Sequence, residues 1–209
     1  GAAMALVRKH LGDKPVVAVI FTHSHVDHFG GIGAVLGEEE AARRKVRIIA
    51  PQGFIEEATS ENLLAGVAMS RRASFMYGSN LPRGGRGHLD SGLGKEPARG
   101  EITILAPTEI IDHTPVETVI DGVHFVFQHA PESEAPAELT FYLPAQKAFC
   151  GAEIVSHTMH NLYTLRGAKV RDALKWSGYI NQAIELFGDA DVVFASHSWP
   201  IWGNERVVD

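Results

Sequence analysis

The sequence contains a single cysteine, Cys150, and no apolar run that approaches the ~18 to 20 residues of a membrane-spanning helix. One cysteine excludes an internal disulfide framework, and its setting in "KAFCGAE" predicts a small buried side chain. The start of the chain also lacks the charged-then-apolar layout of a signal peptide. We therefore expect a soluble chain without disulfides or a membrane span.

Positive charge is also scarce, with 19 Lys and Arg against 25 Asp and Glu and a formal net charge of −6. Affinity for a phosphate backbone depends on clustered Lys and Arg, so this balance argues against nucleic acid as a partner. The 209 residues, 45% of them hydrophobic, are enough for one domain with a sizeable core. We find no internal repeat and no linker, and predict one domain over residues 1–209.

The spacing of apolar residues in the first third predicts alternating helices and strands. A helix is expected over residues 2–11 with its stop at Gly12, followed by strands in "PVVAVIFT" and "KVRIIAP". The stretch 53–78 has a helical pattern, whereas the glycine-rich stretch 79–100 predicts a loop. This order of elements indicates a layered α/β architecture.

The second half predicts mostly β structure and ends with one clear helix. Strands are expected in "EITILAP", "TEIIDH", "ETVIDGVHFVFQHA" and "AELTFYLP", with a hairpin turn at Asp121-Gly122. The segment "RDALKWSGYINQAIELFG" predicts an amphipathic helix that ends at Gly188, and "DVVFASH" predicts one more buried strand.

Three predicted strands each lead into a side chain that can bind a metal. "VVAVIFT" runs into His23, "KAFCGA" into Glu153 and "DVVFAS" into His197. Sites in layered α/β folds form where strand ends converge, because the sheet holds the backbone rigid while loops present side chains. We therefore expect these three residues to meet at one site.

The densest group of such side chains lies in "FTHSHVDHFGG". His23 and His25 are two apart and can point the same way from an extended segment, whereas Asp27 and His28 can face a second point. Imidazole and carboxylate suit zinc or a similar first-row ion, and two such ions form a hydrolytic centre. The pattern predicts a two-metal site.

The other histidines carry no such pattern. We expect His157 and His160 of "HTMH" to support the ligands or the fold, because no Glu follows His157 to complete a His-Glu-x-x-His zinc helix. The rest are expected on the surface or in packing: His10, His88, His113, His124 and His129.

The segment Thr22 to His28 resembles the signature of the metallo-β-lactamase superfamily. The later motifs "SEAPAE", "GAE", "HNLYTLRGAKVRDALKWSGYI" and "FASHSWPIWGNERVV" resemble the alkyl sulfatases of linear or secondary type, which are zinc-dependent hydrolases of alkyl sulfate esters. These motifs extend over most of residues 15–209. The resemblance implies an α/β fold, the metallo-β-lactamase-like αββα sandwich.

The resemblance also implies a set of zinc ligands. One zinc ion would bind His23, His25 and Glu134, a second would bind Asp27, His28 and His197, and Glu153 would bridge the pair. The residues alone do not choose between Glu134 and Glu138 of "SEAPAE"; the family pattern favours Glu134. Two zinc ions per chain and catalytic roles for Asp27 and Glu153 follow from this match.

The family pattern further implies sulfate-binding roles for Asn161, Arg166 and Tyr77. The planar fork of Arg166 suits a pair of anionic oxygens. The expected substrate is an amphiphilic sulfate ester, hydrolysed to alcohol and sulfate by a hydroxide that the two metals activate. Its alkyl tail would lie on apolar side chains: Leu63, Leu64, Phe75 and Met76.

The chain departs from the family pattern at both ends. The histidine cluster starts only 22 residues into the chain, and the sequence stops after "WGNERVVD", where alkyl sulfatases continue into a helical dimerisation region and a sterol-carrier-like domain. We therefore expect a fragment, or a truncated or degraded protein, that lacks the N-terminal strands. The resemblance implies a homodimer at full length and is compatible with a periplasmic or secreted enzyme.

Two other kinds of function remain open from the sequence. One is another hydrolase of the superfamily, such as a lactonase, thioesterase or phosphodiesterase. The other is a non-catalytic module or inactive fragment in which bound metal only stabilises the fold. Structural zinc sites prefer cysteine-rich shells, and no cysteine is among the seven candidate ligands, which favours catalysis.

Overall fold

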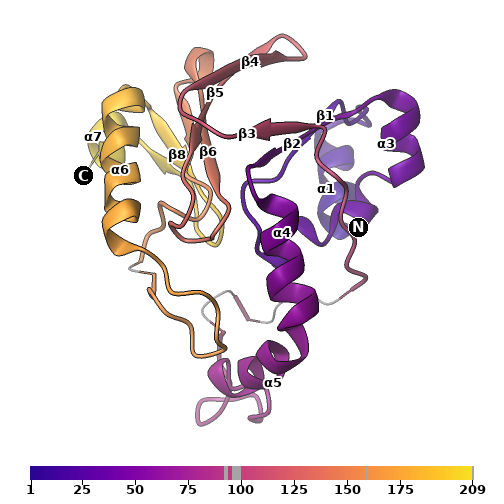
Figure 1. The fold of residues 1–209 in the computed structure, drawn as a ribbon, viewed down its shortest axis with the longest axis vertical. Coiled ribbons are helices and arrows are strands. Elements are labelled where there is room, and N and C mark those ends of the chain that lie inside the picture. Colours follow the sequence, from indigo (N-terminus) through magenta and orange to yellow (C-terminus); the bar gives the residue numbers. More distant parts are fainter. Residues whose placement is uncertain (92–93, 96–99, 159, 209) are drawn as a thin grey trace.

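The computed structural model describes residues 1–91, 94–95, 100–158 and 160–208, which form two β-sheets with helices on their outer faces (Figure 1). The helices and helical turns are α1 (Ala2–Leu11), α2 (Val26–Phe29), η1 (Ile32–Ala34), α3 (Glu38–Arg44), α4 (Phe54–Thr59), η2 (Ser60–Leu64), α5 (Gly66–Met76), η3 (Pro144–Gln146), α6 (Ala173–Phe187) and α7 (Asn204–Val208). The strands are β1 (Ala18–Ile20), β2 (Arg47–Pro51), β3 (Glu109–Ile111), β4 (Val116–Ile120), β5 (Val123–His129), β6 (Leu139–Leu143), β7 (Ala148–Cys150), β8 (Val192–Phe194) and β9 (Ile201–Trp202).

The two sheets differ in strand direction. The first has the order β1-β2-β3 and is parallel throughout. The second has the order β4-β5-β6-β7-β8-β9 and is antiparallel except between β7 and β8. Helices α3 and α4 lie beside the first sheet, and α6 and α7 lie beside the second (Figure 1). The predicted αββα arrangement is confirmed.

The alternation of side chains along β2 explains why the layers stack. Ile48 and Ala50 pack on the helical side, in the cluster that contains residues of α3 and α4. Ile49, between them, points the other way and packs with Phe127 and Leu139 of the second sheet. Since successive strand residues face opposite sides, one apolar run fills both interfaces of the first sheet.

Helix α6 covers the outer face of the second sheet. Its Phe187 ring lies 5.2 Å from the ring of Tyr142 and 5.5 Å from that of Phe149. The Asp172 side chain caps the helix by accepting hydrogen bonds from the backbone N–H groups of residues 174 and 175. The helix ends before Gly188, as the sequence predicts.

Most predicted elements are present, and one strand is wrong. The helix that stops at Gly12, the hairpin at Asp121-Gly122 and the buried Cys150 are confirmed. The expected strand in residues 101–107 does not form, because that segment bonds to the turn after α2: Thr103 N–H donates to the Gly30 carbonyl at 2.9 Å. The predicted loop 79–100 is free of helix and extended strand where described, and parts of it (92–93, 96–99) lie outside the described residues.

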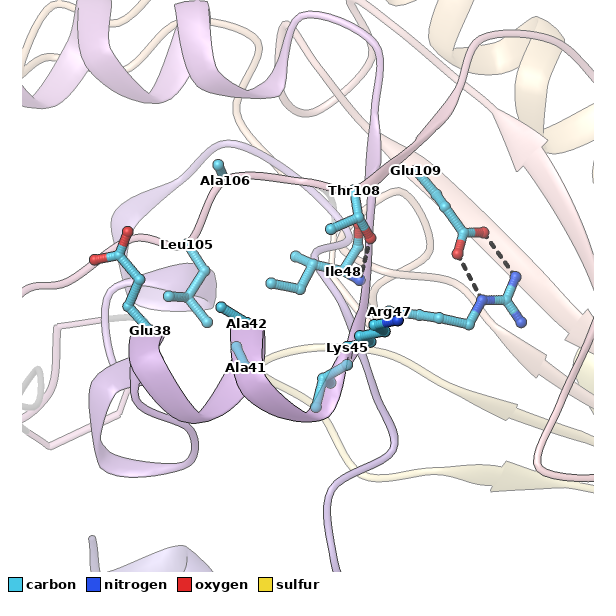
Figure 2. A pocket seen from close by; sticks show the side chains of 11 residues that line it. Glu38, Ala41, Ala42, Lys45, Arg47, Ile48, Leu105, Ala106, Thr108 and Glu109 are labelled. Carbon is cyan, nitrogen blue, oxygen red and sulfur yellow. Dashed lines mark hydrogen bonds and ion pairs between the residues drawn. The ribbon is translucent and has the colours of Figure 1, made fainter.

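A surface hollow of about 480 Å³ lies between α3 and the segment that leads to β3 (Figure 2). Apolar side chains such as Ala41, Ile48 and Leu105 line it, and the ion pair of Arg47 with Glu109 closes one end. It contains none of the predicted metal ligands. Among the described residues, no helix is long and apolar enough to cross a membrane.

Candidate metal centre

The site forms where the two sheets meet. Beyond β1, the chain pairs with the start of β6: the Leu139 N–H donates to the Thr22 carbonyl at 2.8 Å, and the Ser24 N–H donates to the Ala137 carbonyl at 3.2 Å. This pairing places His23 opposite Glu138. The three expected strand ends therefore do converge, but β1 belongs to one sheet and β7 and β8 belong to the other.

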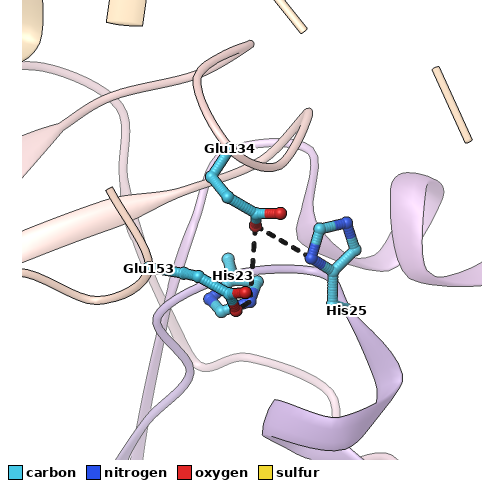
Figure 3. A group of neighbouring side chains, drawn as sticks. All are labelled: His23, His25, Glu134 and Glu153. Carbon is cyan, nitrogen blue, oxygen red and sulfur yellow. Dashed lines mark ion pairs between the residues drawn. The ribbon is translucent and has the colours of Figure 1, made fainter. Parts of the chain in front are cut away.

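The first group of donor side chains comprises His23, His25, Glu134 and Glu153, all buried (Figure 3). One donor atom from each lies within 4.8 Å of the others. Glu134 Oε2 is 2.9 Å from His25 Nδ1 and 3.8 Å from His23 Nε2, and Glu153 Oε2 is 3.3 Å from His23 Nε2. Four neutral or anionic donors thus surround one point.

Two buried atoms of this group make no hydrogen bond within the described part of the chain: His23 Nε2 and Glu134 Oε2. A buried polar atom without a partner costs free energy, about 1 to 3 kcal/mol, so native proteins rarely leave one. A cation among the four donors would satisfy both atoms, and imidazole with carboxylate is a donor set that zinc accepts. The residues therefore fit a metal ion.

A second group, Asp27, His28 and His197, lies directly beside the first. Asp27 and His28 sit on the short helix α2, and His197 follows β8. Asp27 Oδ2 is 3.2 Å from His28 Nε2 and 3.4 Å from His197 Nε2. The seven predicted ligands thus lie in two neighbouring groups, with Glu153 in the first.

Glu153 connects the two groups. Its Oε2 atom lies 2.9 Å from His28 Nε2 and 3.4 Å from His197 Nε2, in addition to its approach to His23. Burial opposes ionisation of this carboxyl, but the four surrounding histidines outweigh it and hold the pKa of Glu153 well below its usual range. Glu153 is therefore an anion at neutral pH that both groups share.

Glu138 has a different setting from Glu134. Its Oε2 accepts hydrogen bonds from the Ser133 hydroxyl at 2.9 Å and the Ala135 N–H at 2.8 Å, and its Oε1 accepts from the Glu153 N–H at 3.3 Å. Complete burial, and next the charge of Glu134, raise the pKa of Glu138 well above its usual value. Glu138 lies behind His23 and fixes the backbone beside two of the donors.

His160 lies beside two of the donors, which agrees with the expectation that it supports the ligands or the fold. Its Nδ1 bonds the Asn161 carbonyl at 2.9 Å, and its Nε2 lies 3.4 Å from both Glu134 Oε1 and Glu153 Oε1. Glu153 is the main cause that raises the pKa of His160. The His-x-x-His spacing gave no signal because these residues lie in a loop, where helical spacing has no meaning; His157 is exposed.

Arg171 is a residue that sequence reasoning missed. This buried guanidinium donates to the Glu134 carboxylate and carbonyl, and to Asn161 Oδ1 at 3.2 Å. The only feature that distinguishes Arg171 of "GAKVRD" from a surface arginine is its burial, and burial of a charged residue cannot be predicted from the sequence.

The structure brings together two of the three predicted sulfate-binding residues. Burial raises the pKa of the Tyr77 hydroxyl, and the nearby Arg166 guanidinium opposes that rise. The charges of Asp27 and Glu153 add to the rise in the Tyr77 pKa. Arg72 of α5 donates to the Arg166 carbonyl at 2.9 Å and fastens this loop.

The five other histidines lie outside both donor groups, as expected. His113 and His124 pair with nearby carboxylates on the surface. His88 is buried in the loop after α5, and His129 is half-buried in β5. His10 is exposed on α1.

Comparison with known proteins places this fold and site. The family model of the metallo-beta-lactamase superfamily matches residues 1–197. The chain belongs to this superfamily. Within it, the relatives are alkyl sulfatases: the chain is 52% identical to a linear primary-alkylsulfatase of a Pseudomonas species over 99% of its length, and 47% identical to the alkyl/aryl-sulfatase BDS1 of Saccharomyces cerevisiae over 98%. The predicted resemblance is confirmed.

Solved structures agree with this assignment. The stereoselective inverting sec-alkylsulfatase Pisa1 from Pseudomonas is 43% identical, with a TM-score of 0.94 over 99% of this chain and 33% of that one. The metallo-beta-lactamase IND-7 is 19% identical with a TM-score of 0.54 over 99% of this chain and 72% of that one, and shares the fold. The chain spans about a third of the curated relatives it matches, 31% and 32%.

Proposed function

We propose that the protein is a zinc-dependent alkyl sulfatase that hydrolyses alkyl sulfate esters to an alcohol and sulfate. The observation that carries this proposal is the pair of adjacent donor groups that share Glu153. His23, His25 and Glu134 would hold one zinc ion, Asp27, His28 and His197 would hold a second, and Glu153 would bridge them. Two bound ions supply Lewis-acid chemistry and lower the pKa of a water molecule toward ~7.

The substrate sulfate would be bound by Arg166, Asn161 and Tyr77. A guanidinium donates two parallel hydrogen bonds, which matches two oxygens of a sulfate group. The Tyr77 hydroxyl adds one donor from the end of α5, and its raised pKa keeps it protonated at neutral pH. These residues orient the ester beside the two donor groups.

The alkyl tail would lie along the segment η2–α5. Glu61 anchors the π-helical turn η2 near the site, with its carboxylate 3.7 Å from His25 Nε2. From this anchored segment, Leu63, Leu64 and Phe75 are 74%, 84% and 85% exposed. Large apolar side chains this exposed favour contact with an apolar ligand.

Metal loading tests the first part of the proposal. The folded protein is expected to bind about two zinc ions per chain, counted by mass spectrometry of the metal after desalting. A saturated, folded sample that holds one ion would contradict the two-site arrangement.

Zinc binding is also expected to release a proton. Burial lowers the pKa of His28, but the carboxylates of Asp27 and Glu153 outweigh burial and raise this pKa to about 9. Hydrogen bonds to the same two carboxylates raise the pKa of His197 to about 10. The two Nε2 atoms lie 3.1 Å apart in a hydrogen bond, so one proton lies between the rings and must leave before both bind zinc. Calorimetry in buffers of different ionisation enthalpy should detect release of about one proton, and zinc affinity should rise as the pH rises above 7.

Replacing Glu134 or Glu138 by Gln distinguishes the two candidates. Glu134→Gln is expected to weaken zinc binding about tenfold or more, because it removes a charge from the first donor group. Glu138→Gln should matter less, since Glu138 belongs to neither donor group and its oxygens already accept hydrogen bonds from Ser133 and from the backbone. Zinc dissociation constants from competition with a chelator measure both; equal losses would put Glu138 among the ligands.

Substrate assays separate the proposal from the other superfamily activities. Dodecyl sulfate, a thioester, a lactone and a phosphodiester should be compared with the zinc-loaded protein under one set of conditions. Hydrolysis of dodecyl sulfate alone supports the proposal. If the protein hydrolyses one of the other substrates and does not hydrolyse dodecyl sulfate, its function is that of the corresponding hydrolase class.

A further inference from the structure

Arg171 occupies a position that connects the candidate metal and sulfate sites. Its side chain is 4% exposed. A buried guanidinium is costly unless its donors are paired, and here three are: Nη2 donates to Glu134 Oε1, Nε to the Glu134 carbonyl at 2.5 Å, and Nη1 to Asn161 Oδ1 at 3.2 Å. The Arg171 N–H also donates to the Leu162 carbonyl at 2.9 Å, which holds the two ends of this loop together.

The contacts with Glu134 decide which of its oxygens is free. Arg171 occupies Oε1 and the backbone carbonyl, so only Oε2 is left to face His25 Nδ1 at 2.9 Å and His23 Nε2 at 3.8 Å. Oε2 is one of the two buried atoms of this donor group that make no hydrogen bond within the described residues. Arg171 therefore presents a single carboxylate oxygen to the first donor group.

The contact with Asn161 decides the orientation of its amide. A guanidinium only donates, so the atom of Asn161 that meets Arg171 must be the carbonyl oxygen. The two N–H donors of the amide are then left for another partner. An anion such as sulfate needs donors of this kind, and Asn161 is exposed to receive one.

We propose that Arg171 is a positioning residue for both sites, which orients Glu134 toward the metal and the Asn161 amide toward the substrate anion. The proposal rests on the proposed function for its anion half. It assigns Arg171 no contact with the reacting atoms. One substitution of Arg171 should therefore weaken the binding of both zinc and sulfate, although the two ligands contact different residues.

The test is Arg171→Lys, which keeps the charge but cannot pair with Glu134 and Asn161 at once. We expect about tenfold weaker zinc binding, as for other groups that orient metal ligands, and about tenfold weaker binding of inorganic sulfate to the zinc-loaded protein. Chelator competition and calorimetry measure the two constants. Arg47→Lys is the matched control, because it breaks a comparable fork on Glu109 (Figure 2) and should change neither constant.

A second variant and a wild-type measurement protect the test against a folding defect. In Asn161→Ala, adding Arg171→Lys should cost no further sulfate affinity but should still weaken zinc binding. In the wild type, the Arg171 Nε–H signal in ¹⁵N NMR should shift when zinc is added and again when sulfate is added.

Four results overturn the proposal in whole or in part. Unchanged constants in a folded Arg171→Lys protein, or an Nε–H signal that ignores both ligands, show a merely structural arginine. Weaker zinc binding with unchanged sulfate affinity removes the shared role. If the wild-type protein binds zinc but no sulfate, the proposed function and the role of Arg171 in orienting Asn161 are both wrong. The role of Arg171 in orienting Glu134 is then decided by the zinc measurement.

Discussion

Glu153→Gln is expected to remove most of the zinc and the activity together. A single oxygen of Glu153 lies 3.3 Å from His23, 2.9 Å from His28 and 3.4 Å from His197, so one charge serves both donor groups. An amide cannot offset two dications, and residues that only orient a ligand already cost 10- to 100-fold, so we expect a loss of at least about 100-fold in zinc affinity. Metal content and dodecyl sulfate hydrolysis should be measured on the same samples.

The control for this substitution is Glu132→Gln. Glu132 is an exposed carboxylate two residues before Glu134 and pairs with Lys175 on the surface, so its loss should change neither zinc content nor turnover. Because Glu153 follows the buried strand β7, far-ultraviolet circular dichroism should confirm that the sheet is intact. Normal zinc loading and activity in Glu153→Gln would remove Glu153 from the site.

Substitutions of Arg166 are expected to affect the substrate and spare the metal. Arg166→Ala removes a charge-assisted hydrogen bond to sulfate, worth about 1.5 to 3 kcal/mol, or roughly one to two orders of magnitude in kcat/KM. Arg166→Lys keeps the charge but loses the planar fork, so it should also cost activity. Zinc content should remain at the wild-type level, because Arg166 belongs to neither donor group.

Arg43→Lys, on the exposed side of α3, is the control for the Arg166 series. Steady-state hydrolysis of dodecyl sulfate and the inhibition constant of inorganic sulfate should both be determined. If Arg166→Ala and Arg166→Lys hydrolyse the ester at the wild-type rate, Arg166 does not bind sulfate. A change in zinc content would instead point to a role in the metal site.

The sequence indicated which side chains gather at the candidate site better than how they are arranged there. His23, His25, Asp27 and His28 stood out because four donor-type side chains fall within six positions at a strand end. Glu134 and Glu138 could not be told apart, since both precede β6 and only the folded loop shows which one turns its oxygens to the backbone. Burial and hydrogen bonds distinguish Glu134 from Glu138, and both depend on residues that are distant in the sequence.

Arg171 was missed, and His160 was expected only as a supporting residue without a partner, for one physical reason. Both reach the site from a loop without periodic spacing, so no pattern links them to Glu134, which is 37 and 26 positions away. The wrong strand at residues 101–107 has a similar cause, because its apolar pattern suits a sheet but its backbone partner is a turn. Tertiary contacts override local preference in each case.

The π-helical turn η2 (Ser60–Leu64) separates the part of the chain that contacts the donor groups from the exposed part of α5. A π-helical turn accommodates one residue more than the α-helical turn it replaces. Because the turn absorbs this residue, the helical segments on either side keep the faces that a regular helix would give them. A deletion within α5 has no such turn to absorb it and would rotate everything after the deletion by about 100°, since 3.6 residues complete a turn. Changes of chain length at η2 are therefore expected to preserve the direction of Phe75 and Tyr77, whereas changes within α5 would redirect both and leave Glu61 beside His25.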